Sequence, residues 1–207
     1  MSLLKRIFGL APQPGTRGPR DMITVVSGLP RSGTSMAMKM LDAGGLEPLT
    51  DNLRTADNDN PKGYYEFERV KSLDKGDTAW VPEARGKVVK VISALLRYLP
   101  PDQHYKVIFM QRRLKENVAS QKKMLVNRGE ATDTVTDEEL MVLLEKHLKT
   151  VYAWLNSQPN VDVLYLKYHE VVENPREQAR IINAFLGGIL DEDKMAHVAD
   201  EKLYRNR

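Results

Sequence analysis

Residues 22–41 read MITVVSGLPRSGTSMAMKML and decide the fold class. The apolar run from Met22 to Val26 is typical of a buried parallel strand, and Met36, Met40 and Leu41 suit one face of a helix. A loop rich in glycine, proline and serine joins the two. Such a loop aims backbone N–H groups and the positive end of the helix dipole at one point, which favours phosphate or a chemically similar anion.

The loop has the glycine spacing of a P-loop, Gly28-x4-Gly33, but Thr34 stands where the P-loop lysine should be, with Ser35 after it. In a P-loop NTPase that lysine reaches the β- and γ-phosphates and the next hydroxyl holds Mg²⁺. Here the cation, Arg31, lies inside the loop. The pattern therefore predicts an anion other than a metal-bound triphosphate, with a plain strand-to-helix turn as the alternative.

Strand and helix patterns alternate along the rest of the chain. Further strands are predicted at 87–92, 105–110 and 161–166, and helices from about 115, from a Thr136-x-x-Glu139 capping box through 155, and over 175–186. This order predicts an α/β fold, a three-layer parallel sheet with helices on both faces. Residues 1–20 are expected to form a flexible arm and residues 21–207 a single domain.

Composition limits the kind of protein and of partner. A net charge of +3 over 207 residues favours an anionic ligand but falls short of a nucleic-acid-binding signal, so no nucleic acid is expected. The chain has no cysteine, which excludes disulfides and fits a cytoplasmic location. No apolar run approaches the roughly 20 residues that span a bilayer, so no transmembrane segment is expected.

The loop and the helix after it resemble a known family. Residues 28–35 look like the 5′-phosphosulfate-binding loop of the sulfotransferases, which use 3′-phosphoadenosine 5′-phosphosulfate (PAPS) as donor, and residues 40–43 are closest to the tyrosylprotein sulfotransferases and their bacterial relatives. The resemblance extends over roughly residues 22–190 and implies the P-loop-like fold of that family. It implies that the donor is held by Gly28, Pro30, Arg31, Ser32, Gly33, Thr34 and Ser35.

Two later motifs extend the resemblance. Arg112 and Ser120 have the spacing of the pair that holds the donor's 3′-phosphate in the family, and a guanidinium fork with a hydroxyl suits a terminal phosphate. Arg113 is expected to be a solvated charge. Tyr168 matches the family's tyrosine near adenine, whereas His169 departs from the usual glutamate.

The resemblance leaves the general base open. Lys90 matches a lysine that lies two residues before the catalytic histidine of cytosolic sulfotransferases, but Ile92 occupies the place of that histidine. Tyrosylprotein and heparan-type members use a glutamate as the base. In bacterial relatives an acid follows an Asn-Pro-x-Gly-Tyr stretch, and in this chain Glu66 follows such a stretch at residues 60–64. Glu68 is the rival, and either acid could instead interact with a helix dipole. Arg31, Lys90 and Glu66 are therefore the predicted catalytic residues.

The sequence as a whole predicts a sulfotransferase that needs no metal and moves a sulfonyl group to a hydroxyl or amine of an unidentified small-molecule, carbohydrate or peptide acceptor. The alternatives are a P-loop small-molecule kinase and a non-catalytic nucleotide-binding protein on a degenerate sulfotransferase fold. The loops at 46–63 and 127–133 are expected to shape the acceptor pocket, and the helix at 138–155 allows a homodimer. Arg205 and Arg207 are expected to lie in a frayed tail.

Overall fold

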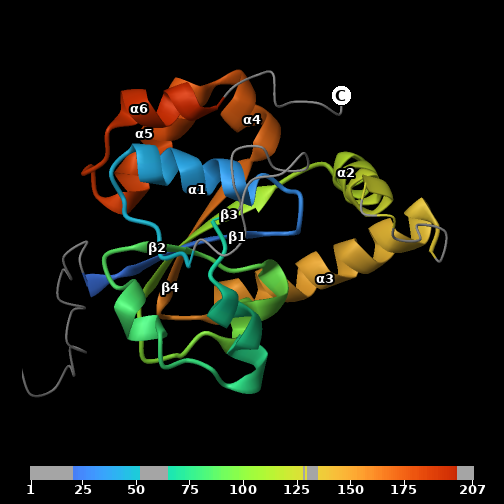
Figure 1. Ribbon diagram of the computed structural model, residues 1–207, viewed down its shortest axis with the longest axis horizontal. Helices are drawn as coiled ribbons and strands as arrows, with labels where there is room; N and C mark the ends of the chain where they lie inside the picture. The colour runs from blue at the N-terminus through green and yellow to red at the C-terminus, as the bar shows by residue number, and fades with distance from the viewer. Residues whose placement is uncertain (1–20, 52–64, 128, 130–134, 200–207) are drawn as a thin grey trace, which may run out of the picture.

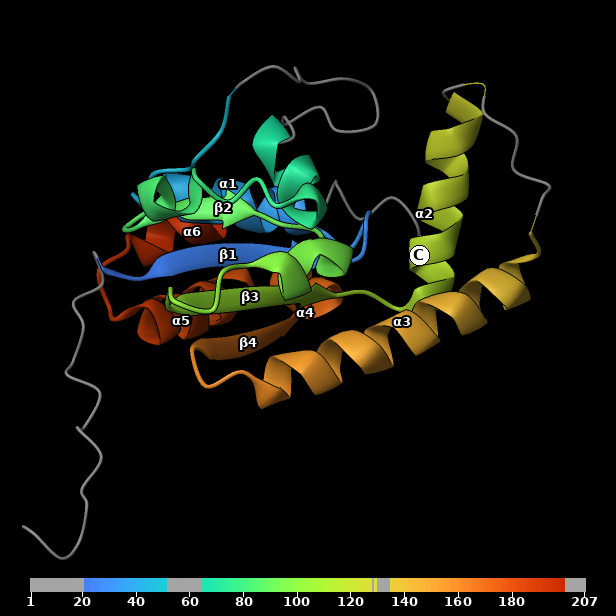
Figure 2. The same ribbon diagram turned by 90° about the horizontal axis from the view of Figure 1, so that it is seen from below.

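A four-stranded parallel sheet forms the centre of the computed structural model, which describes residues 21–51, 65–127, 129 and 135–199 (Figures 1 and 2). The strands lie in the order β2-β1-β3-β4. Their bounds are β1 Ile23–Gly28, β2 Val88–Lys90, β3 Tyr105–Gln111 and β4 Val161–Lys167. All pairs are parallel, so all four carboxyl ends meet at one edge of the sheet.

β1 is the most enclosed strand. All six of its residues are buried, because it lies between β2 and β3 and is covered on both faces. The register aligns Val26 with Lys90 on one side and Gly28 with Met110 on the other. β4 is the outer strand, and most of its residues are only partly buried or exposed.

Helices cover the sheet on both faces (Figure 1). The helices that pack on one face, around a shared hydrophobic cluster, are α1 Thr34–Ala43, α4 Tyr168–Glu173, α5 Pro175–Leu186 and α6 Glu192–Val198. The elements on the other face are α3 Asp137–Ser157 and the 3₁₀ helices η3 Glu68–Lys75, η4 Val81–Ala84 and η5 Ser93–Tyr98. α2 Leu114–Asn127 stands beyond the carboxyl ends of the strands (Figure 2).

The predicted three-layer α/β fold is confirmed, with differences in detail. The second strand is shorter than the predicted 87–92, because the chain leaves the sheet after Lys90 and turns into η5. The short helices α4 and α6 were not predicted from the sequence. The predictions for 1–20, for Arg205 and Arg207, and for most of the loops at 46–63 and 127–133 lie outside the described residues. Among the described residues, no helix is both long and apolar enough to cross a membrane.

α3 begins with the predicted capping box. The Thr136 Oγ1 accepts a hydrogen bond from the Glu139 N–H at 3.2 Å, and the Glu139 carboxylate accepts one from the Thr136 N–H at 3.0 Å. The Thr136 N–H and hydroxyl both donate to the Glu139 carboxylate, and these two bonds hold the pKa of Glu139 below its ordinary value, since they favour the charged form. The box therefore fixes where this long helix starts.

We predict that Thr136→Ala lowers the free energy of unfolding by about 1 kcal/mol, because a donor at the helix start loses its partner. Urea unfolding would measure the loss. Thr150→Ala is the matched control, since Thr150 only donates back to the Lys146 carbonyl within the same helix, and its effect should stay within about 0.5 kcal/mol. Equal losses in the two variants would contradict a special role for the cap.

Candidate functional site

The loop between β1 and α1 has a backbone that only glycine permits at two positions. Gly28 and Gly33 have φ angles of 147° and 102°. A Cβ at Gly28 would lie 2.6 Å from the Met110 carbonyl oxygen, and one at Gly33 would lie 2.5 Å from the Tyr168 ring. Arg31, at the centre of the loop, also has a positive φ of 69°. The predicted glycine spacing therefore reflects both backbone conformation and close packing.

α2 and the connection before it hold this loop through side chains that reach its carbonyl groups. The Asn117 amide donates to the Pro30 carbonyl at 2.9 Å, and the Arg112 guanidinium donates to the Arg31 carbonyl at 3.1 Å. Asn117 is fully buried. Its role was missed in the sequence, where the available signal was a poor helix former inside a helix, between Arg112 and Ser120.

Two arginines, a serine and a tyrosine that were all predicted for the donor site come together beside the loop. Arg31 Nε donates to Ser120 Oγ at 3.1 Å. The Arg112 guanidinium lies 4.6 Å from the centroid of the Tyr168 ring, and its Nε lies 3.4 Å from a Glu116 carboxylate oxygen. The structure thus joins Arg31, predicted for the 5′ end of the donor, to Ser120, predicted for the 3′ end. Arg113 is exposed, as expected.

The loop has the properties of an anion site. Ser32 Oγ is buried and has no hydrogen-bond partner among the described residues. In the described part of the chain, no side chain caps the N-terminus of α1, which begins at Thr34. The loop therefore gathers several groups that bind anions: the Ser32 hydroxyl, the N–H groups at the start of α1 and the charge of Arg31. Together they fit a phosphate or sulfate group.

Lys90 joins the loop from the neighbouring strand. It is the last residue of β2, and its side chain is only 8% exposed. Its Nζ donates to Ser35 Oγ at 3.4 Å and lies 3.8 Å from a Glu66 carboxylate oxygen. A cation, a hydroxyl and a carboxylate are thus placed together beside the first turn of α1.

The two candidate acids have different surroundings. The Glu66 side chain is 22% exposed and faces Lys90, and its carbonyl accepts a hydrogen bond from Thr50 Oγ1 at 2.8 Å. The Glu68 side chain is 58% exposed and pairs with Lys71 at 2.8 Å. Of the two acids, Glu66 is therefore the one placed beside Lys90.

Tyr65 precedes Glu66 and adopts an unusual backbone conformation, with a φ of 51°. Its hydroxyl donates to Asp42 Oδ2 in α1 at 2.9 Å. Burial, together with the hydrogen bond to Asp42 and the charge of Asp42, raises the pKa of Tyr65 to about 12. The phenol therefore keeps its proton, and remains a donor, at neutral pH.

The position two residues after Lys90, where cytosolic sulfotransferases have a histidine, holds an isoleucine in this chain. Ile92 is 42% exposed at the carboxyl edge. Ser93 Oγ shares a hydrogen bond with His147 Nε2 of α3 at 2.9 Å, on the face opposite α1. Burial is the main cause that lowers the pKa of His147, with the charge of Arg97 adding to it. His147 thus packs behind the sheet rather than beside Glu66.

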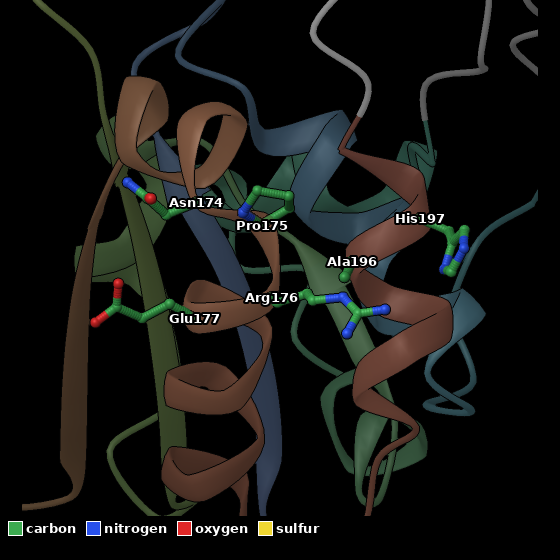
Figure 3. A pocket seen from close by; sticks show the side chains of 6 residues that line it. All are labelled: Asn174, Pro175, Arg176, Glu177, Ala196 and His197. Atoms are coloured by element: carbon green, nitrogen blue, oxygen red, sulfur yellow. The ribbon is translucent and has the colours of Figure 1, made fainter.

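A hollow of about 440 Å³ lies elsewhere, between the start of α5 and α6 (Figure 3). None of the predicted site residues lines it; the residues that do are Asn174, Pro175, Arg176, Glu177, Ala196 and His197. In the close view, the Glu177 and His197 side chains point away from each other. Across the described residues, no group of three or more histidine, aspartate or glutamate side chains could hold a metal ion.

Comparisons with known proteins give consistent results. A model of the sulfotransferase domain matches residues 21–206. The fold is similar to mouse sulfotransferase SULT7A1 complexed with PAP (TM-score 0.54, 20% identity, 87% of this chain and 63% of that one). It is also similar to retinol dehydratase in complex with androsterone and inactive cofactor PAP (TM-score 0.50, 18% identity, 88% of this chain and 64% of that one). The chain thus spans less than two thirds of the length of these two structures. The comparison with curated proteins found no match.

We predict that Asn117→Ala lowers the free energy of unfolding by about 1–3 kcal/mol, because it removes a buried donor from the loop carbonyl. PAP (3′,5′-adenosine bisphosphate), the ligand named with both similar structures, is the probe for the loop, and a loosened loop should raise the Kd measured with this probe by about tenfold, which corresponds to about 1.4 kcal/mol. Urea unfolding and calorimetric titration with PAP would measure the two effects.

Lys123→Ala is the matched control, because Lys123 lies in the same helix and its side chain is exposed. Its effects should be smaller on both measurements. An Asn117→Ala protein that binds PAP as tightly as the unaltered chain would show that α2 does not hold the loop for binding.

Proposed function

The chain belongs to the sulfotransferase domain family, and from this premise we propose that it transfers a sulfonyl group from PAPS to a hydroxyl or amine group of an acceptor. The observation that carries the proposal is the contact of Arg31 with Ser120 beside a loop rich in hydrogen-bond donors. A single arginine at a glycine-rich turn would support this function much less, because isolated glycine-rich turns are common.

We assign donor binding to the loop, to α2 and to two residues outside them, Arg112 and Tyr168. The loop amides, with the hydroxyls of Ser32, Thr34 and Ser35, would surround the 5′-phosphosulfate, and Arg31 would balance its charge. Arg112 and Ser120 would take the 3′-phosphate. Tyr168 would contribute to the adenine end of the site, although the Arg112 guanidinium already lies over its ring.

PAPS supplies an activated sulfonyl group, held to its 5′-phosphate by an S–O bond. In the proposed transfer, the acceptor oxygen or nitrogen forms a bond to sulfur while that S–O bond breaks, and PAP leaves with the bonding electron pair. Lys90 and Arg31 stabilise the charge that develops on the leaving phosphate oxygen. The Glu66 carboxylate takes the acceptor's proton. No step requires a metal ion.

The acceptor is proposed at the level of chemical class. Retinol dehydratase is similar in fold, and the ligands named with its solved structures are androsterone and retinol. We therefore place a small-molecule alcohol first, ahead of a carbohydrate or peptide hydroxyl. The cytoplasmic location stays a prediction from the cysteine-free sequence.

Donor binding is tested by thermal unfolding with PAP, and with ATP in the presence and absence of Mg²⁺. PAP at about 100 times its Kd should stabilise the protein by about 2.7 kcal/mol, and Arg112→Ala should abolish most of this effect. Arg113→Ala is the matched control, because Arg113 is exposed at the same helix start. Stabilisation by ATP with Mg²⁺ alone would instead support a small-molecule kinase.

The role of Glu66 is tested by PAP release from PAPS with a panel of phenols, aliphatic alcohols and amines as acceptors. Glu66→Gln should lower kcat by about 10²- to 10⁴-fold while leaving the Kd for PAP unchanged, because it removes the proton acceptor but not the donor site. Glu68→Gln should retain its kcat, since Glu68 faces solvent. Full turnover by Glu66→Gln would assign the proton to another group.

A further inference from the structure

We propose that Tyr65 is a positioning residue, whose bond to Asp42 and left-handed backbone aim Glu66 at Lys90. This inference rests on the proposed function, because it explains how the carboxylate assigned to proton transfer is held. Neither Tyr65 nor Asp42 is expected to touch the donor. Both act through Glu66.

The first argument is the backbone conformation of Tyr65. A bulky residue other than glycine rarely adopts a positive φ, and such a residue persists only where its surroundings hold it there. In the part of the chain that the structure describes, the only other non-glycine residue with a positive φ is Arg31, in the anion loop. The two departures from ordinary backbone geometry thus occur at the proposed anion site and directly before the proposed base.

The second argument is the way in which neighbouring side chains fix this segment. Tyr65 packs against the hydrophobic cluster on the α1 face, whereas Phe67 packs against the cluster on the opposite face, with its ring 5.4 Å from that of Trp80. Glu66 lies between them, where the chain passes from one face of the sheet to the other. Its carboxylate is thereby directed to Lys90 at the carboxyl edge.

The third argument is the anchor that Tyr65 provides. Its hydroxyl donates to Asp42 at 2.9 Å, and Asp42 belongs to α1, the helix that starts at the anion loop. A second bond holds the same segment, because Thr50 Oγ1 donates to the Glu66 backbone carbonyl at 2.8 Å. The carboxylate is therefore tied to the same helix that would hold the donor, and their separation is fixed by α1 itself.

The bond between Tyr65 and Asp42 joins a half-buried tyrosine to an exposed carboxylate at the surface, so its loss should affect stability little. Its loss should affect chemistry more, because a displacement of about 1 Å at a reacting group can lower the rate about 10²-fold. A positioning role therefore predicts a large effect on kcat with nearly unchanged stability. A purely structural role predicts the reverse.

The experiment compares Tyr65→Phe, Asp42→Ala and Asp42→Asn in the PAP release assay, with the acceptor of the panel that reacts fastest. Tyr65→Phe and Asp42→Ala should each lower kcat by about 10- to 100-fold, with an unchanged Kd for PAP. The double variant should be no slower than either single variant, because both remove the same bond. Asp42→Asn keeps an acceptor oxygen and should recover most of the activity.

Tyr105→Phe is the matched control. It also removes one tyrosyl hydrogen bond, to the Pro100 carbonyl at 2.9 Å, but at the amino end of β3, far from the carboxyl edge. Its kcat should not change. A comparable loss of kcat in this variant would show that any tyrosyl hydrogen bond has the same effect, and would overturn the proposal.

A second measurement does not depend on turnover. The coupling between Glu66 and Lys90 is measured by a double-mutant cycle of unfolding, with Glu66→Gln and Lys90→Met, in the unaltered and the Tyr65→Phe backgrounds. The coupling should be lost when the Tyr65 hydroxyl is absent. An unchanged coupling together with an unchanged kcat in Tyr65→Phe would overturn the positioning role, while an inactive Glu66→Gln would still support the proposed base. Full turnover by Glu66→Gln would overturn both.

Discussion

The structure depends on the conformation of one short loop, at the carboxyl end of a fully buried strand. β1 cannot shift, because each of its residues is enclosed, and the loop after it is fixed by close contacts at Gly28 and Gly33. Asn117 of α2 and Arg112, which lies between β3 and α2, then hold the loop from outside. A site for an anion requires donors that are already in place, and both constraints serve that requirement.

Strand order explains why distant residues meet at this loop. Each strand supplies one group where it ends: Lys90 ends β2, Arg31 follows β1, Arg112 follows β3 and Tyr168 follows β4. Because all four strands are parallel, these groups lie along one edge, where ligands of open α/β sheets bind. Glu66 is the exception, since it reaches the edge from a segment outside the sheet and needs anchors of its own.

Much of this arrangement could be predicted from the sequence, because strand and loop signals are local. The alternation of strands and helices and the capping box at Thr136 required only residue patterns. The family resemblance paired Ser120 with Arg112, whereas the structure shows its contact with Arg31. Asn117 and Tyr65 could not be assigned in this way. The contact of Asn117 with Pro30 and the φ angle of Tyr65 arise from tertiary packing, which overrides local preference.

The two edge strands of the sheet differ in how they are covered, and this difference affects the behaviour of the chain at high concentration. β2 is covered by the segment around Pro48, which bridges to Val88, whereas β4 has no strand neighbour on its outer side among the described residues. An open edge can template pairing with another chain. β4 carries exposed charges near both ends, on Asp162 and Lys167. Burying these charges against a second strand would be costly, so the edge is protected from aggregation.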